Sequence, residues 1–410
     1  MSDVSRTVEA VWRIEGARVV ATLARVTGDF GLAEDLAQEA VADALAQWPA
    51  TGVPQNPGAW LTAVAKRKAI DGWRRRDRLD ERYRALAHEL EDTVDGADAW
   101  QPIEDDVLRL VFTACHPVLG REAQVALTLR VVGGLTTEEI ARMFLVPVAT
   151  IQQRIVRAKK TLAAARVPFE APHPAEWKSR LGSVLGVVYL VYTEGYAATS
   201  GETWIRHDLA NEALRIGRIL AALVPREPEV HGLVALMELQ ASRFGARVSA
   251  TGEPILLEDQ DRSRWDRSQI SRGRAALARA DALGRGRGNY ALQAAIAECH
   301  ATAPSVAGTD WAHIVLLYEA LGQLTRNPVV ELNLAVAVSM ATGPASALLL
   351  VDRLVDDGSL RGSPLLPGVR GELLARLGRT EEARSEFVTA ASLTANSRQR
   401  DVLLAKIAAL

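Results

Sequence analysis

One segment, Gly133–Leu162, constrains the fold more than any other part of this 410-residue sequence. Within it, Thr136 and Glu139 have the spacing of a capping box, which predicts that a short helix begins there. Pro147 interrupts the pattern, and a second helix is expected from about Val148. Two short helices joined by a tight turn are typical of a helix-turn-helix. The apolar residues expected inside are Ile140, Ala141 and Phe144 from the first helix and Ile151, Ile155, Ala158 and Leu162 from the second.

The opposite face of that second helix is basic and polar. Arg and Gln can form bidentate hydrogen bonds with base edges in the major groove, whereas Lys159 and Lys160 suit phosphates. An ordinary helical hairpin with a solvated basic face would show the same pattern, so both interpretations stay open. The residues on this face are Thr150, Gln153, Arg154, Arg157 and Lys160.

Charge is distributed unevenly along the chain, although the formal net charge is only -2. Residues 66–78 hold seven basic side chains against two acidic ones, and residues 142–166 hold six basic side chains and no acidic ones. Between them, residues 89–106 hold eight acidic side chains and no Lys or Arg. A phosphate backbone would be attracted to the two basic islands alone.

The general class of the chain follows from its composition. Long alternations of Ala, Leu, Arg and Glu with few β-branched runs predict an all-α protein, and the length predicts more than one domain. Cys115 and Cys299 are the two cysteines, which argues against a disulfide framework or a cysteine-rich zinc site. No apolar stretch is long enough for a membrane span and the first residues are polar, so we expect a cytoplasmic protein without membrane contact.

A second motif lies in Ala33–Leu45. Its acidic and amide side chains recur at i, i+3, i+4 and i+8, which places them on one helix face opposite an apolar stripe. Such a face can dock onto a basic or polar partner helix, and it can equally be a solvated surface. Its members are Asp35, Gln38, Glu39 and Asp43.

A third motif, Asn56–Arg78, follows a loop rich in Pro and Gly at residues 49–58. It predicts a basic helix with Trp60 beside an apolar stripe formed by Leu61, Ala65, Ala69 and Trp73. Asp71 lies at helical neighbour distance from Arg67 and from Arg74 and Arg75, and such pairing can hold arginines in fixed poses. Aromatic residues between basic ones suit single-stranded DNA, although a basic solvated helix is the simpler alternative.

In their order and spacing, these three motifs resemble the extracytoplasmic-function sigma factors of RNA polymerase, over about residues 8–166. The resemblance implies an all-α chain with a sigma-2 domain (1–80), an acidic linker (81–105), a sigma-4 helix-turn-helix domain (106–167) and a C-terminal helical domain (168–410). It implies core RNA polymerase and promoter DNA as partners, with contacts to the β′ clamp helices and the β flap. In the family, the counterparts of Asp35, Gln38, Glu39 and Asp43 bind the β′ clamp helices.

The resemblance also assigns DNA contacts. It implies that the loop before Trp60 and the basic helix open the minus-10 element, and that the helix from Val148 reads the minus-35 element. Leu145 departs from the family, because most members have a turn glycine there. The residues implied for the minus-10 element are Gln55, Asn56, Trp60, Lys66, Arg67, Asp71, Arg74 and Arg75. Those implied for the minus-35 element are Thr150, Gln153, Arg154, Arg157 and Lys160.

The C-terminal part carries a partial repeat. Pro328, Gly343 and Ala347 are echoed by Pro364, Gly378 and Ala383 at offsets of 36, 35 and 36, which is close to a tetratricopeptide period. The residues of segments such as FTACHP (112–117) and NPVVELNLAVAV (327–338) resemble those of the sigma-factor subgroup with a tetratricopeptide-like extension. We therefore expect a regulatory domain that acts through a regulatory protein or an intramolecular contact.

No motif in the sequence predicts catalysis, a metal site or a cofactor. Cys115–His116 and Cys299–His300 could suggest zinc, but adjacent residues on a helix point about 100° apart. The polar clusters at 194–208 and 258–261 lack a phosphate loop or a nucleophile motif, and Trp265 beside the second is expected to anchor an interface.

Two other functions stay open on the sequence. A one-component regulator would have one helix-turn-helix and a ligand- or protein-sensing helical tail. A helical hydrolase would rest on the polar clusters alone. The acidic face of 33–45 and the basic helix of 56–78 separate these readings, because a simple regulator needs neither.

Overall fold

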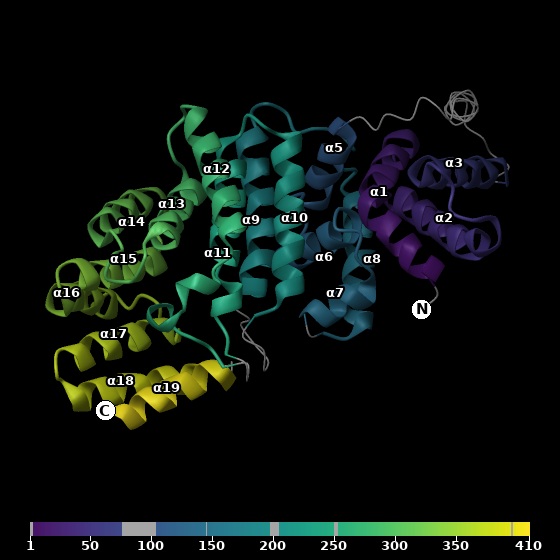
Figure 1. Ribbon diagram of the computed structural model, residues 1–410. Coiled ribbons are helices and arrows are strands. Elements are labelled where there is room, and N and C mark those ends of the chain that lie inside the picture. Colours follow the sequence, from purple (N-terminus) through teal and green to yellow (C-terminus); the bar gives the residue numbers. More distant parts are fainter. Residues whose placement is uncertain (1–2, 76–103, 145, 197–204, 250–252, 395–396) are drawn as a thin grey trace. The chain divides into compact units, whose positions relative to one another are not determined.

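The structure is a computed structural model that describes residues 3–75, 104–144, 146–196, 205–249, 253–394 and 397–410 (Figure 1). Throughout these ranges the elements are helices, with one isolated β-bridge between Val248 and Pro254, so the predicted all-α class is confirmed. None of the described helices is long and apolar enough to cross a membrane. The chain divides into two compact units, residues 1–188 and 189–410, each described by itself below.

The first unit begins with three mutually packed helices. Gly28 adopts a φ of +65° and ends the first of them, and the carboxylate of Asp29 then accepts a hydrogen bond from the amide of Leu32 (3.0 Å) to start the second. The second helix continues through Pro49 to Thr51, into the segment that was predicted to be a loop. Large side chains such as Leu23, Trp48 and Leu61 are fully buried between them. The helices are α1 (Asp3–Thr27), α2 (Phe30–Thr51) and α3 (Pro57–Arg75).

A second group of four helices in the same unit contains the predicted helix-turn-helix. The amide of Glu139 donates to the hydroxyl of Thr136 (3.1 Å) and the amide of Thr136 donates to the carboxylate of Glu139 (2.8 Å), which is the predicted capping box. The predicted apolar stripe of the second helix is buried as expected, whereas Phe144 is half-buried. The helices are α5 (Glu104–Ala114), α6 (Arg121–Val131), α7 (Thr137–Phe144) and α8 (Val148–Ala164).

Helix α9 (Trp177–Tyr196) contains the boundary between the two units. Within the first unit, the ring of its Trp177 packs on Phe112 of α5 with the centroids 5.1 Å apart. The guanidinium of Arg180 donates to the carbonyl of Phe112 (3.1 Å). The start of α9 is therefore part of the first unit.

The second unit begins with helices that approach one another closely. An ideal Cβ on Gly232 would lie 2.7 Å from the amide nitrogen of Ala291, so glycine is what allows α11 to contact α13. Around this crossing, the core includes Leu236, Ile314 and Trp265. The helices are α10 (His207–Leu223), α11 (Pro228–Ala241), α12 (Arg267–Ala282) and α13 (Asn289–Thr302), with short 3-10 turns η2 (Phe244–Ala246), η3 (Leu257–Asp259) and η4 (Arg262–Arg264).

The remaining helices of this unit follow one another as packed neighbours (Figure 1). Gly343 and Gly378 have φ values of +106° and +74° and precede α16 and α18, and Ala347 and Ala383 are fully buried one turn later. The echoed residues thus occupy equivalent positions in two consecutive helix pairs. The helices are α14 (Trp311–Thr325), α15 (Pro328–Ala341), α16 (Pro344–Asp356), α17 (Leu365–Arg376), α18 (Thr380–Leu393) and α19 (Ser397–Ala409).

The predicted role of Trp265 as an interface anchor is wrong. Its side chain is 3% exposed and belongs to the core of the second unit. The guanidinium carbons of Arg262 and Arg243 lie 4.7 and 5.4 Å from the ring centroid. Arg262 and Arg243 therefore form cation–π contacts with this buried ring.

Candidate nucleic-acid interface

The outward face of α8 carries the predicted base-reading side chains. Gln153, Arg157 and Lys160 are exposed, and Thr150 and Arg154 are half-buried. The buried stripe at 151, 155, 158 and 162 fixes which way this face points. The first turns of α8 therefore present donors and acceptors that could reach base edges, as a recognition helix requires.

Arg154 is oriented by a neighbouring helix. Its guanidinium forms an ion pair with the carboxylate of Glu122 at the start of α6, with Nη2 and Oε2 2.7 Å apart. The carboxylate is 75% exposed, so this contact is accessible to solvent and weak. It nevertheless gives the arginine a preferred pose in the absence of DNA.

The acidic face of α2 is occupied by lysines in this structure. The Lys68 ammonium from α3 lies 3.0 Å from the carboxylate of Asp43 and 3.4 Å from that of Glu39. Its hydrogen bond to Asp43 is the main reason that the pKa of Lys68 is raised. Lys159 of α8 donates to the Asp35 carboxylate (2.7 Å). Three of the four predicted residues on this face therefore have basic partners, and Gln38 is half-buried beside them.

Glu34 is a central residue of this region that the sequence analysis missed. It precedes Asp35 on α2, its side chain is 5% exposed, and it accepts from Arg130 of α6 (3.1 Å) and from Lys159 of α8. Burial lowers the pKa of Lys159, but the carboxylates of Glu34 and Asp35 outweigh burial and raise it above its ordinary value. Lys159, which was expected to face phosphates, instead bonds to α2.

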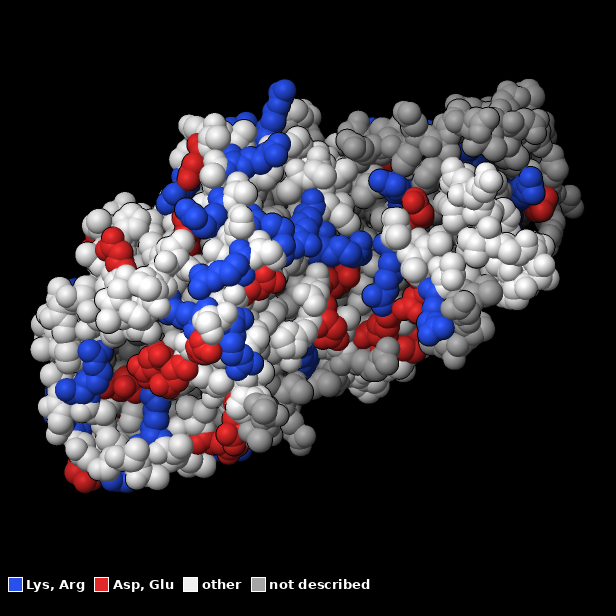
Figure 2. Space-filling view, in the orientation of Figure 1, with Lys and Arg blue, Asp and Glu red and all other residues white. Residues whose placement is uncertain are grey.

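Two further ion pairs join the first helices to the helix-turn-helix group. Arg25 of α1 donates to the buried carboxylate of Asp106 on α5 (2.9 Å), and Arg13 of α1 pairs with the capping residue Glu139 of α7. Together with Glu34 and its partners, these contacts hold α1 and α2 against α5–α8. Figure 2 shows basic and acidic side chains lying next to one another in this part of the surface, not as a patch of one sign.

The predicted minus-10 residues have different surroundings. Asn56 caps α3, because its side-chain oxygen accepts from the amide of Ala59 (3.1 Å). Trp60 is half-buried, with its ring 5.4 Å from that of Trp48 in an edge-on arrangement. Gln55 is exposed. The loop before α3 is thus held at its end by a cap and an aromatic pair.

The basic residues of α3 are only partly described. Arg67 and Asp71 are exposed, and no ion pair joins them in the described part of the chain, contrary to the expected pairing. The side chains of Arg74 and Arg75 lie outside the described residues, as does Leu145. Burial, followed by the nearby charge of Arg25, lowers the pKa of Lys66.

Three side chains of the polar clusters considered for catalysis or metal binding have structural partners. Glu194 pairs with Arg206 (3.3 Å), and the ring of His207 packs edge-on against Phe244. Asp261 accepts from the amide of Ser263 (2.9 Å). Within the described ranges, no group of three or more His, Cys, Asp or Glu side chains is placed to hold a metal ion.

Comparisons with known proteins agree with the helix-turn-helix geometry. Residues 12–79 match the family model for sigma-70 region 2, and residues 109–162 match the one for sigma-70 region 4. These regions contain α2, α3 and α8 in the expected order. The chain belongs to the extracytoplasmic-function group of sigma-70 factors.

Relatives of this sigma factor extend the match beyond these two regions. An uncharacterized protein of Rhizobium meliloti (strain 1021) is 44% identical over 396 residues, which cover 93% of this chain and 90% of that protein. A probable ECF RNA polymerase sigma factor, SigI, of Mycobacterium tuberculosis is 29% identical over 163 residues, or 39% of this chain and 56% of that protein. Residues 180–281 match a family of unknown function, DUF6596, and no solved structure matches the chain.

The family assignment establishes the general function. As a sigma factor, the protein directs transcription initiation, which requires interaction with core RNA polymerase and promoter DNA. Sigma factors are transcription factors without enzymatic activity of their own, and the absence of catalysis in this chain stays a prediction.

Proposed function

We propose that this sigma factor divides its contacts among three helices. The acidic face of α2 binds the β′ clamp helices of core polymerase, the loop before α3 and α3 itself act at the minus-10 element, and α8 reads the minus-35 element. The outward polar face of α8 carries the proposal, because four buried apolar residues fix its direction and leave its first turns free for a major groove. The corresponding domains are 1–80, 106–167 and 168–410, with an acidic linker at 81–105.

Contacts with the polymerase would extend beyond α2. The sigma-4 domain would meet the β flap, and the acidic linker would follow the polymerase near its RNA exit path. The eight acidic side chains at 89–106, with no Lys or Arg among them, suit a path along basic protein surfaces that bind nucleic acid.

Asp35 has a role in two states under this proposal. In the free chain it bonds to Lys159 of α8, and on polymerase it would instead bond to the β′ clamp helices. The Asp35 side chain is 67% exposed, whereas that of Glu34 is 5% exposed, so an incoming partner can reach Asp35 but not Glu34. Polymerase therefore competes with Lys159 for an accessible carboxylate.

Two reciprocal charge reversals test the division. Asp35→Lys combined with Glu39→Lys should abolish binding to core polymerase while DNA contact is retained. Arg154→Glu should leave core binding unchanged and weaken binding to minus-35 duplex, because it removes a side chain able to contact base edges. Both are measured by co-purification with core and by run-off transcription from a candidate promoter. If the unaltered chain neither binds core nor gives a promoter-dependent transcript, the proposed division fails.

A third variant tests the competition at Asp35. Lys159→Met keeps the length and apolar character of the side-chain stem but removes the ammonium. We expect tighter binding to core in the absence of DNA, because Asp35 no longer has an intramolecular partner. Unchanged or weaker core affinity would contradict the proposed competition.

The C-terminal helical unit would modulate activity through a regulatory protein or an intramolecular contact. Its helices form a large surface of the kind that helical repeats use for binding. A truncated chain that tests this should end at Tyr196, because one that ends before Trp177 loses the contacts of Trp177 and Arg180 with Phe112. Equal promoter-dependent transcription from residues 1–196 and from the full chain would refute a regulatory role.

A further inference from the structure

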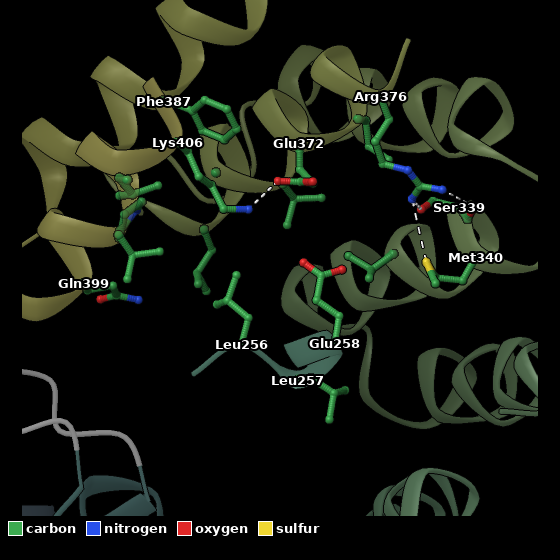
Figure 3. A pocket seen from close by; sticks show the side chains of 18 of the residues that line it. Leu256, Leu257, Glu258, Ser339, Met340, Glu372, Arg376, Phe387, Gln399 and Lys406 are labelled. Carbon is green, nitrogen blue, oxygen red and sulfur yellow. Dashed lines mark hydrogen bonds and ion pairs between the residues drawn. The ribbon is translucent and has the colours of Figure 1, made fainter. Parts of the chain in front are cut away.

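The second unit contains a cavity that lies outside the regions matched by the sigma-70 family models. It has a volume of about 630 Å³ and lies among α15, α17, α18 and α19, with the turn η3 at its side (Figure 3). Pockets of about 300–1,000 Å³ are the usual size for small-molecule ligands. Figure 2 shows acidic and basic side chains gathered around a hollow in this part of the unit.

The walls of the cavity are mainly apolar and partly exposed. Val336, Met340 and Leu365 line it and are 36%, 37% and 43% exposed, although they lie on helices whose other faces form a core. Leu257 and Trp311 also line it and are half-buried. A ligand that covers this apolar surface removes it from water, and this burial contributes favourably to the binding free energy.

Three of the charged side chains in the cavity already have partners. The ammonium of Lys406 bonds to the carboxylate of Glu372. The guanidinium of Arg376 donates to the hydroxyl of Ser339 (2.7 Å) and to its carbonyl (3.4 Å), and lies 3.7 Å from the sulfur of Met340. The donors of Arg376 are thus directed at α15.

Glu258 differs from these side chains. Among the described residues it has no hydrogen-bond or ion-pair partner, and it lines the cavity from η3. Figure 3 shows its carboxylate extending into the cavity, toward the side where Glu372 and Lys406 form their pair. A carboxylate acceptor on an exposed side chain therefore faces a space with mainly apolar walls, and a ligand cation would find both charge and shape complementarity there.

We propose that this cavity binds a small organic cation with an apolar body. A protonated amine or guanidinium of the ligand donates to the carboxylate of Glu258, and its apolar part packs on Val336, Met340 and Leu365. The size of the recess favours a small molecule over a folded partner, because a protein–protein interface needs a broad contact area. The site would give this sigma factor a small-molecule input that its DNA-binding helices lack.

A set of three fluorescent probes tests charge and shape together. Monodansylcadaverine carries a protonated amine on a dansyl group, N-butyl dansylamide lacks the charge, and dansyl-6-aminohexanoate carries a carboxylate. Titration of the full chain at pH 7.5, followed by the blue shift and increase of dansyl emission, should give the order cationic, then neutral, then anionic in affinity. Equal affinities of the cationic and neutral probes would overturn the proposal.

Substitution of Glu258 separates the site from general surface binding. Glu258→Gln keeps the size of the side chain and removes its charge, so we expect monodansylcadaverine to bind about tenfold more weakly, as expected for loss of a charge-assisted hydrogen bond. Asp259→Asn is the matched control, because Asp259 is exposed on the same turn and does not line the cavity. An equal loss in both variants, or no loss in Glu258→Gln, would refute a role for Glu258.

A cavity-filling variant tests the location. An ideal Cβ on Gly368 of α17 meets no atom within 4 Å, and its φ is not positive, so Gly368→Leu can place a side chain in the cavity without straining the helix. We expect all three probes to lose affinity while circular dichroism and thermal unfolding stay as in the unaltered chain. Undiminished binding of monodansylcadaverine to this variant would place the site elsewhere and overturn the proposal. None of these readouts involves polymerase, so their outcome is independent of the proposed division of sigma contacts.

Discussion

Replacement of Glu34 by glutamine tests whether one buried carboxylate holds α2 against α6 and α8. Glu34 accepts from Arg130 and Lys159, whose side chains are 15% and 16% exposed. Glutamine preserves the size of the side chain and one acceptor oxygen, but both cations lose their shared anion. The contact between the two helix groups should therefore weaken, while each group keeps its own apolar core.

The magnitude follows from what the two cations retain. Removal of one partner from a buried ion pair costs about 3–5 kcal/mol. Lys159 keeps its bond to Asp35 at 2.7 Å, and Arg130 keeps one to the carbonyl of Leu135 at 3.0 Å. We therefore expect a smaller loss of about 2 kcal/mol, which corresponds to a roughly thirtyfold shift in the opening equilibrium.

Native-state hydrogen exchange followed by mass spectrometry measures the free energy of local opening at α2 and α8. A local measurement is needed because a chain of two units is not expected to unfold in one step. Peptides from α2 and α8 should exchange faster in Glu34→Gln, and peptides from α14 should not change. Glu39→Gln is the control, since Glu39 lies on the same helix, is 60% exposed and contacts Lys68 at 3.4 Å. Similar exchange of α2 and α8 in the two variants would refute the inferred role of Glu34.

Two further predictions concern the second unit. Gly232→Ala should lower the free energy of unfolding of this unit by about 1–3 kcal/mol, because the added methyl group would lie 2.7 Å from the amide nitrogen of Ala291. Thermal unfolding measures this loss, and Gly368→Ala is the control because a Cβ there has open space. Equal melting temperatures of the two variants would contradict the close approach of α11 and α13. Burial, with two neighbouring guanidinium groups, lowers the pKa of His300 to about 4 from 6.5, so its stabilising contribution is present above pH 6.5 and is lost as the pH falls toward 4. Between pH 6.5 and pH 4 the free energy of unfolding of the unaltered chain should fall by about 2–3 kcal/mol, and it should fall less in His300→Gln. Urea unfolding at several pH values measures this, and parallel pH profiles for the unaltered chain and His300→Gln would refute the prediction.

Local sequence patterns predicted the helix-turn-helix well because its determinants lie within one turn of each other. Thr136 and Glu139 cap one another across three residues, and a 3.6-residue period alone identifies Ile151 and Ile155 as buried. The 35-residue interval between Gly343 and Gly378 similarly indicated two helix pairs, because the turn before the second helix of each pair needs a residue with a positive φ. Such features depend on neighbours along the chain and can be read without a tertiary structure.

Features that depend on contacts between distant residues were not predictable in this way. Glu34 looked like one more helical glutamate, and only the approach of α6 and α8 gives it two basic partners. Trp265 lay in a charged segment that indicated a surface, yet its ring is buried, and the half-buried guanidinium groups of Arg243 and Arg262 lie over it. The cavity beside Glu258 combines residues that lie between 48 and 148 positions downstream of it, from Val306 to Lys406, so no local pattern could indicate it.

The bond between Lys159 and Asp35 also has a thermodynamic consequence for how ligands act on one another. Any polyanion that attracts the ammonium of Lys159 away from α2 leaves Asp35 without its intramolecular partner, and any protein that takes Asp35 leaves Lys159 available to phosphates. Because coupling between two binding events is reciprocal, DNA on α8 would raise the affinity of α2 for its protein partner by the same factor as that partner raises the affinity for DNA. Under the proposed function, one lysine, with a side chain only 16% exposed, would thus make the two binding faces of the first unit cooperative without a contact between their ligands.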